Sequence, residues 1–428
     1  MSEIPAQEQE YRKQIHIVGG GTIEPVREHL ALAARAYGST ARRLGYLCRT
    51  ELPELDTNVH LTRMADPRSM IETSEDLHRL AHEITADLTT KVVIWNPAVA
   101  DFRGQVGDVT SGIHAERLRS TDEQTMKLTP NKKIIGTFRT VPVNGMQKPR
   151  KDIVAVGFKT TAGAEPIEQY SRGLKLMKDA SLNIVVANDT RTRNNMIILP
   201  HEVVDTETTD RDLVLRSLVE LISTRINLTF TESTVIDGQP IPWESDEVFP
   251  ALRTVVDYCR QKGAYKPFQG KTAGHFAAKI GHHTFLTSIR KSNFNDLEKV
   301  GLVRVETDGD DHVLAYGARP SVGGQSQRSV FDEHPEADCI VHFHCPPKPG
   351  AQVHTVSQRE YECGSHQCGE NTSRGLRPVG DGKIKVVYLD NHGPNLVFHH
   401  SIDPQEVINF IKDNFDLSQK TGGYIPQS

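Results

Sequence analysis

The stretch ADCIVHFHC, residues 337–345, carries the side chains that most directly suggest chemistry in this chain. An apolar run ends in His342 and His344, and side chains two residues apart in a strand point to the same face. Two neutral imidazoles on one face can bind one ion, but protein-bound zinc needs a third ligand. His392, which follows the strand-like run IKVVYLD, is the candidate. The alternative is a buried strand that happens to contain histidines.

The cysteines near these histidines have simpler interpretations. Cys339 and Cys345 occupy odd positions of the same run, so they should face away from the histidines and join a core. Cys363 and Cys368, with a histidine between them, could form a second metal site, but their spacing is longer than the usual C-x2-C. We favour a helix N-terminus there, with Ser365 as its cap.

A second group of candidates lies in three loops that follow predicted strands: Gly19–Glu24, Asn96–Gly104 and Ala187–Arg193. In open parallel sheets, ligands bind at the carboxyl ends of the strands. The three glycines of the first loop could let a backbone approach a phosphate, or could simply make a tight turn. Asp101 is a sensible contact for a divalent ion or a base edge. The alternative for Asp101 and Asn188 is that they form turns at strand ends.

The first half of the chain, residues 13–230, alternates apolar strand-like runs with helix-like segments. This pattern indicates a parallel sheet covered on both faces, a three-layer Rossmann-like α/β domain. We expect helices over Pro25–Leu44, Ile167–Lys178 and Asp210–Ile226, and a strand at Tyr46–Cys48.

The second half begins after a segment rich in proline and polar residues, 231–246, which we interpret as a linker. Residues 247–428 then predict a more irregular α/β domain of short strands. Helices are expected from Phe249, around Val330–His334 and over Pro404–Phe415.

The composition limits the function classes. The 428 residues include 50 basic and 55 acidic side chains, a net charge of -5, which argues against a generally basic nucleic-acid-binding surface. We find no run of about 18 apolar residues and no apolar signal region at the N-terminus. Six cysteines do not suggest a disulfide scaffold. We therefore expect a cytoplasmic protein with no nucleic-acid or membrane partner.

Four motifs occur in order in the first half: HIVGGGTIEPVR, NPAVADFR, VGFKT and VANDT. Together they resemble the phosphopantothenate–cysteine ligase family, the synthetase half of the coenzyme A flavoprotein pair. The resemblance implies ligation of 4'-phosphopantothenate to cysteine through an acyl-nucleotide intermediate, with CTP or ATP and Mg²⁺. The nucleotide- and phosphate-binding residues that it implies are Gly19, Gly20, Gly21, Ala98, Asp101, Phe158, Asn188 and Asp189.

The chain departs from the ligase pattern at two places. The family has lysines after the Ala-Asp strand, and here the matching stretch is Glu116–Arg119, so that Arg117 would take the catalytic cation's place. The family's Ser-Ser-Gly loop with its asparagine is missing after Pro25–Arg27. Either Gly38–Thr40 replaces that loop or the ligase chemistry is lost.

A second ordered set, TAGHFAAK, LTS, RPS, VFDEHPEADCIVHFHCP and NHG, lies in the second half. It resembles the class II aldolase/adducin family and covers nearly all of residues 247–428. The resemblance implies a Zn²⁺ ion, or a similar divalent ion, bound by His342, His344 and His392. Three protein ligands leave the open position of a catalytic site.

The acid/base group of this second family is not found at its usual place. Its glutamate after Pro-Ser is replaced by Gly323, and the Gly-Asn of its phosphate loop by Gly274 and His275. An unperturbed imidazole titrates near ~6.5, so His275 could move protons at neutral pH. Asp332 and Glu333 are further candidates if they point inward.

Two functions follow as hypotheses. The first is a fused metabolic enzyme, with a zinc-dependent aldolase-type lyase acting on a small phosphorylated carbonyl substrate beside a ligase-like nucleotide- or phosphate-binding domain. The second is a catalytically reduced ligand-binding or oligomeric scaffold that retains both folds. The two families also imply a homo-oligomer. We favour the enzyme, because a bare scaffold has no need of three converging imidazoles.

Overall fold

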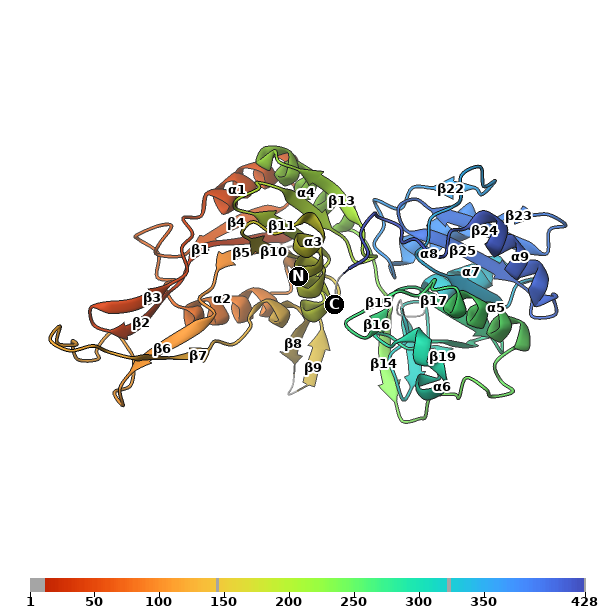
Figure 1. Ribbon diagram of the computed structural model, residues 1–428, viewed down its shortest axis with the longest axis horizontal. Helices are drawn as coiled ribbons and strands as arrows, with labels where there is room; N and C mark the ends of the chain where they lie inside the picture. The colour runs from red at the N-terminus through yellow and green to blue at the C-terminus, as the bar shows by residue number, and fades with distance from the viewer. Residues whose placement is uncertain (1–11, 144–145, 322–324, 427–428) are drawn as a thin grey trace, which may run out of the picture. The chain divides into compact units, whose positions relative to one another are not determined.

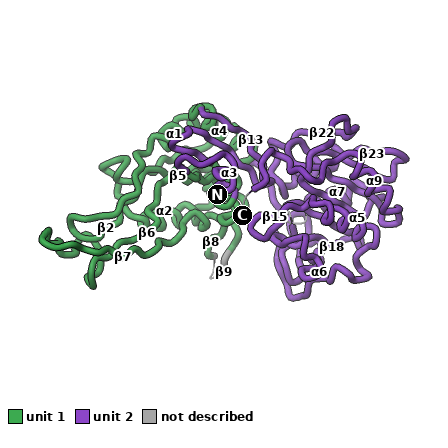
Figure 2. Tube along the Cα trace, in the orientation of Figure 1, with its two compact units in different colours: residues 1–160, 175–186, 210–226 green, residues 161–174, 187–209, 227–428 purple. Residues whose placement is uncertain are grey.

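The computed structural model describes residues 12–143, 146–321 and 325–426. The chain divides into two compact units, which Figure 2 shows in different colours. Unit 1 comprises Met1–Thr160, Lys175–Val186 and Asp210–Ile226, and unit 2 comprises Thr161–Leu174, Ala187–Thr209 and Asn227–Ser428. Two segments from the first half of the sequence therefore belong to unit 2.

The first half forms a seven-stranded sheet in the order β13-β12-β11-β10-β5-β1-β4. Figure 1 labels β1, β4, β5, β10, β11 and β13 of this sheet. Its strands are β1 (Gln14–Gly21), β4 (Asp56–Leu61), β5 (Thr90–Ala98), β10 (Val154–Thr161), β11 (Ile184–Asp189), β12 (Asn195–Ile198) and β13 (Val204–Thr208). Strand β1, next to the edge strand β4, runs parallel to β4 and β5, and β10 runs parallel to β5. The associated helices are α1 (Ser39–Glu51), α2 (Ser74–Ala86), α3 (Pro166–Ala180) and α4 (Arg211–Arg225). The predicted Rossmann-like α/β fold is confirmed.

Smaller elements extend from this sheet. They are β2 (Ile23–Arg27), β3 (Leu30–Ala33), β6 (Phe102–Val106), β7 (Met126–Pro130), the 3-10 helix η1 (Ile135–Arg139), β8 (Thr140–Val143) and β9 (Met146–Pro149). The strands pair as the antiparallel hairpins β2–β3, β6–β7 and β8–β9.

The prediction of a helix over Pro25–Leu44 was wrong. The hairpin β2–β3 occupies its first part, and α1 begins only at Ser39, after Gly38 in a left-handed conformation with φ 74°. The predicted strand at Tyr46–Cys48 was also wrong, because these residues lie within α1. The alanine-rich composition favoured a helix, but cross-strand pairing outweighed that weak propensity.

The second half forms a ten-stranded, mostly antiparallel sheet, in the order β14-β20-β19-β18-β17-β21-β25-β24-β22, with β23 paired to β24. Its strands are β14 (Glu232–Ile236), β17 (His275–Lys279), β18 (Thr284–Ser288), β19 (Leu302–Thr307), β20 (His312–Tyr316), β21 (Cys339–His342), β22 (Thr355–Val356), β23 (Arg377–Val379), β24 (Ile384–Leu389) and β25 (Gly393–Phe398). A separate pair is β15 (Pro267–Phe268) and β16 (Lys271–Thr272). The helices are α5 (Pro250–Gln261), η2 (Phe294–Asp296), α6 (Leu297–Val300), α7 (Gln325–Glu333), α8 (His366–Gly375) and α9 (Pro404–Asn414).

The segment interpreted as a linker, residues 231–246, is not wholly irregular. It contains β14, which pairs in parallel with β20 at the edge of the second sheet. None of the helices in the described part of the chain combines the length and apolar character that a membrane span requires.

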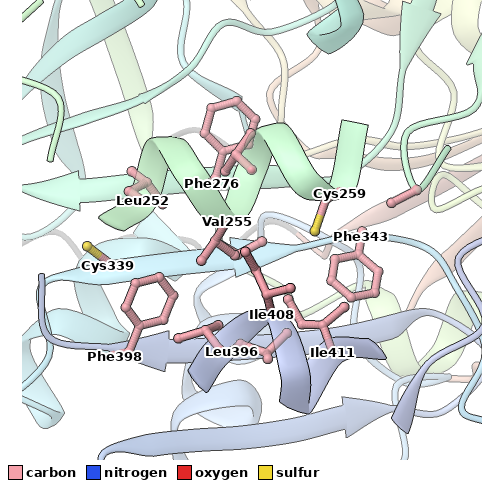
Figure 3. Close-up of a cluster of buried hydrophobic side chains, with 14 of the residues drawn as sticks. Leu252, Val255, Cys259, Phe276, Cys339, Phe343, Leu396, Phe398, Ile408 and Ile411 are labelled. Atoms are coloured by element: carbon pink, nitrogen blue, oxygen red, sulfur yellow. The ribbon is translucent and has the colours of Figure 1, made fainter. Parts of the chain in front are cut away.

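The central strand β21 separates two apolar layers. Cys339, Val341 and Phe343 join the cluster formed with α5 and α9, part of which Figure 3 shows. Ile340 belongs to the opposite cluster, which includes Phe331 of α7. Because side chains alternate along a strand, His342 must lie on the same side as Ile340, away from α5 and α9.

Candidate metal centre

The three predicted ligands come together at the end of β21. His342 is the last residue of that strand, His344 follows two residues later, and His392 lies in the turn between β24 and β25. One ring nitrogen from each of the three histidines lies within 4.8 Å of the other two. The exposed fractions are 1% for His342, 7% for His344 and 1% for His392.

The spacing of the nitrogens suits a divalent ion. His342 Nε2 lies 3.2 Å from His392 Nε2. Two imidazole nitrogens at about 2.0–2.1 Å from a tetrahedral zinc ion are about 3.3–3.4 Å apart. The pair therefore already has nearly the separation that shared coordination requires.

A backbone contact fixes the tautomer of His342. Its Nδ1 lies 2.8 Å from the carbonyl oxygen of Pro394, which can only accept a hydrogen bond. The proton therefore sits on Nδ1, and Nε2 presents its lone pair toward His392. Metal-bound histidines characteristically donate their second ring N–H to a carbonyl or carboxylate in this way.

The site keeps its imidazoles neutral. Burial lowers the pKa of His342 to about 4, against an ordinary value of 6.5. Burial and the neighbouring His342 and His201 hold the pKa of His392 well below its ordinary value. Neutral imidazole is the form that binds a metal, so at neutral pH these side chains need not lose a proton to do so.

Gly393 lets His392 approach β21. Its φ is 155°, and a Cβ built there would lie 2.1 Å from the carbonyl oxygen of Phe343. No side chain fits in that space. The glycine that follows His392 is therefore required by the close approach of two backbones beside the ligands.

His275 lies beside the metal-ligand set rather than in it. It pairs directly with His342 across β17 and β21, and the ring centroids are 4.8 Å apart. Its Nδ1 lies 3.1 Å from Nε2 of Gln327, which also donates to Thr287 Oγ1 at 2.8 Å. Burial, followed by His342, lowers the pKa of His275 well below its ordinary value. Its predicted catalytic role stays a prediction.

The two other acid/base candidates do not point inward. Asp332 and Glu333 are exposed, and Asp332 forms an ion pair with Arg328 on its own helix. They were wrong choices, because the sequence does not determine how α7 is rotated against the sheet. Gly323, which replaces the family's glutamate, lies outside the described residues.

The cysteines behave as expected. Cys339 and Cys345 are buried in the core cluster on the far side of β21. Ser365 caps α8, since its Oγ accepts from the backbone N–H of Cys368 at 3.0 Å. Cys363 and Cys368 line a narrow pocket together with His342 and His392, a proximity that the sequence did not reveal.

His201 is a further histidine of this region that the sequence did not indicate. This residue follows Pro200 in the loop between β12 and β13, and only 4% of it is exposed. Its ring centroid lies 4.7 Å from that of His392 within unit 2. A lone histidine so far from the motif has no spacing signal that could have identified it.

In unit 1, the glycine loop and the end of β5 lie together. Gly21 of β1 pairs with Ala98 of β5. A Cβ on Gly19 would lie 2.4 Å from that of Ala41, and one on Gly21 would lie 1.9 Å from the carbonyl oxygen of Ala34. Gly20 has φ 104°. Local packing is thus sufficient to explain these glycines, and their contact with phosphate stays a prediction.

Three other predicted residues of unit 1 are accessible. Asp101 is exposed and forms an ion pair with Lys133 at 2.7 Å. Phe158 is half-buried, with the Arg211 guanidinium 5.7 Å from its ring centroid. Arg117 is exposed in an irregular segment. Their predicted roles also stay predictions.

Asn188 and Asp189 end strand β11, and their environments differ. Asn188 is half-buried. Asp189 accepts hydrogen bonds from Thr161 Oγ1 and from backbone N–H groups that include those of Gly163 and Ala164. Burial by itself would raise the pKa of Asp189, but these donors hold it well below its ordinary value. Asp189 organises its loop, and nucleotide contact by either residue stays a prediction.

Comparison with known proteins agrees with the two predicted resemblances. Residues 253–348 match the family model described as Class II Aldolase and Adducin N-terminal domain. Among curated proteins, none matches the sequence significantly.

Solved structures match each half separately. The DNA/pantothenate metabolism flavoprotein from Streptococcus pneumoniae shares 16% identity, covering 49% of this chain and 98% of its own, with a TM-score of 0.40. The C-terminal domain of the coenzyme A biosynthesis bifunctional protein CoaBC shares 17%, covering 50% and 93%, with a TM-score of 0.33. L-Fuculose-1-phosphate aldolase from Thermus thermophilus shares 15%, covering 38% and 92%, with a TM-score of 0.26.

The close approach at Gly393 predicts that Gly393→Ala will disturb the site. The new methyl group should push β25 away from β21, lowering the free energy of unfolding by about 1–3 kcal/mol and weakening metal binding. Chemical denaturation and metal titration would measure both effects. Gly281→Ala is the matched control, because a Cβ there meets nothing closer than 3.6 Å. Equal behaviour of the two variants would contradict the prediction.

Proposed function

We propose that this chain, in which a ligase-like half is fused to a class II aldolase-like half, is a metal-dependent lyase acting on a small phosphorylated carbonyl compound. The observation that carries the proposal is the convergence of three buried histidines, His342, His344 and His392, with ring nitrogens within 4.8 Å. Zinc is the ion that we expect, because a set of three imidazoles suits it well.

The donor set favours a catalytic site over a structural one. Structural zinc sites usually have four protein ligands, whereas three leave a position for substrate. A bound divalent ion would supply Lewis-acid stabilisation of an oxygen that gains negative charge as a carbon–carbon bond breaks. The protein itself keeps a proton on Nδ1 of His342, which donates to the carbonyl oxygen of Pro394, and buries the three histidines away from bulk water.

A lyase of this kind also needs a group that moves a proton. His275 lies one strand away from the ligand set, on the same face as its direct partner His342. If Gln327 donates to His275 Nδ1, as its Nε2 position indicates, then the ring proton of His275 is on Nε2. In this state His275 presents an N–H and can donate a hydrogen bond to an oxygen of the substrate.

The scaffold hypothesis explains less of the site. Three imidazoles at 1–7% exposure bring polar nitrogens into the protein interior. Burial of polar groups costs free energy unless they are paired. In a protein that used these strands only for assembly, apolar side chains could replace the histidines without loss of stability.

For the first half we propose a nucleotide- or phosphate-binding role, with CTP or ATP and Mg²⁺ as the expected ligand. Support comes from the ordered motifs and from the adjacency of Gly21 and Ala98 at the ends of β1 and β5. The missing asparagine loop leaves ligation itself unsupported, so binding rather than catalysis is proposed.

Metal content tests the first proposal. Purified wild-type protein should carry about one divalent ion per chain, and His342→Ala and His392→Ala should each lose it, because two imidazoles hold zinc far more weakly than three. Inductively coupled plasma mass spectrometry measures the ratio. His283→Ala is the control, since His283 is exposed and stands apart from the site. A metal-free wild type, purified without chelators, would refute the metal site.

Cleavage assays test the reaction class. Metal-loaded protein should split at least one member of a panel of ketose 1-phosphates into two carbonyl fragments, quantified by chromatography. His342→Ala should reduce the rate at least about 100-fold, because removal of the Lewis acid removes most of the transition-state stabilisation. Metal-loaded protein that cleaves no member of the panel would support the scaffold hypothesis.

Calorimetric titration with CTP and with ATP, each with Mg²⁺, tests the first half. Asp101→Asn should weaken binding about 10-fold or more, because the variant loses a charged hydrogen-bond acceptor. The exposed Asp108, replaced by asparagine, is the matched control. Equally strong binding by the two variants would show that Asp101 does not contact the nucleotide. Absence of binding to the wild-type protein would refute the nucleotide proposal.

A further inference from the structure

We propose that His201, from the β12–β13 loop, is a fourth functional histidine of the metal site, and that it contacts the group bound at the ion's open position. This inference rests on the proposed metal-dependent function. Nothing in the class II aldolase-like half supplies this residue, because it comes from the other half of the sequence.

The first argument is distance. The ring centroid of His201 lies 4.7 Å from that of His392, at an interplanar angle of 45°. The centroids of the ligand pairs His342–His392 and His344–His392 are 4.6 Å and 4.7 Å apart. His201 is therefore as near to His392 as the two other ligands are.

The second argument is how firmly the loop beside His201 is held. Glu202 adopts φ 69°, which a non-glycine residue rarely does. Its carbonyl oxygen accepts from Tyr170 Oη at 2.7 Å and from Lys420 Nζ at 3.0 Å. Its carboxylate also forms an ion pair with Lys420 at 3.3 Å, with both side chains almost fully buried. Such a costly arrangement fixes the loop in one position.

The third argument is that the same C-terminal segment also contacts a ligand's backbone. The N–H of Thr421, next to Lys420, donates to the carbonyl oxygen of His344 at 3.1 Å. A Cβ on Gly422 would lie 2.9 Å from a methyl group of Val203. Residues 420–422 thus connect the backbone of a proposed ligand to the loop that carries His201.

The position of His201 argues for a role beside the ion. The possible metal-binding group of His342, His344 and His392, whose ligand atoms lie within 4.8 Å of one another, does not include His201. His201 nevertheless contacts the ring of His392. An imidazole that adjoins one ligand of an open site is well placed to exchange a hydrogen bond with the fourth group on the ion.

The test uses full-length protein loaded with Co²⁺, whose visible absorption reports its ligands, and azide as the probe for the open position. Wild type, His201→Ala, His201→Phe and the control His283→Ala would each be titrated with azide. His201→Phe keeps a ring against His392 but has no nitrogen. Both His201 variants should keep about one Co²⁺ per chain and bind azide about 5- to 20-fold more weakly, the loss expected for one hydrogen bond.

Three results would overturn the inference. Azide affinity in His201→Phe equal to wild type would show that His201 only packs against His392. Loss of Co²⁺ from both His201 variants, with His283→Ala unaffected, would show a role in holding the ion instead. Wild type that binds no Co²⁺ would refute the proposed function itself, and this outcome is distinct from the first two because it appears before azide is added.

Discussion

The alternation of side chains along β21 is the constraint on which the second half depends. The same short run supplies Val341 and Phe343 to the core beneath α5 and α9, and His342 and His344 to the opposite side. A register shift of one residue would exchange the two sets and would place imidazoles in the apolar layer. The pairing register of this one strand therefore determines both the packing of the core and the position of the proposed metal ligands.

Burial determines the protonation and the charge of the proposed metal site. Burial lowers the pKa of His342 to about 4 and holds the pKa of His392 well below its ordinary value, and the proposed ligand set contains no carboxylate. A divalent ion held by three neutral imidazoles would keep its full double charge in an interior where charge is poorly screened. Such a centre should attract an anionic oxygen of the substrate strongly. This property agrees with a phosphorylated or enolate-forming compound better than with a neutral one.

The sequence predicted what depends on local pattern and missed what depends on distant packing. The convergence of His342, His344 and His392 agrees with strand periodicity and with the order of motifs along the chain. The Ser365 cap follows from helix-capping rules. The inward orientation expected for Asp332 was wrong, since the rotation of a helix against a sheet leaves no local signal. His201 was missed because only tertiary structure brings the β12–β13 loop to His392.

The buried ion pair Lys420–Glu202 links the C-terminal segment to a loop from the first half of the sequence, and this link affects whether the second half can fold alone. A fragment that starts after residue 230 would contain every aldolase-like motif, yet its Lys420 would lose the carboxylate and the carbonyl that it contacts. The fragment would also lack Tyr170, whose hydroxyl contacts the same ammonium group, so this part of the interior would become open to water. Genetic separation of the two halves would then yield a second half that is compromised at its own C-terminus. The second half therefore depends on residues of the first half for the packing of its own C-terminal segment.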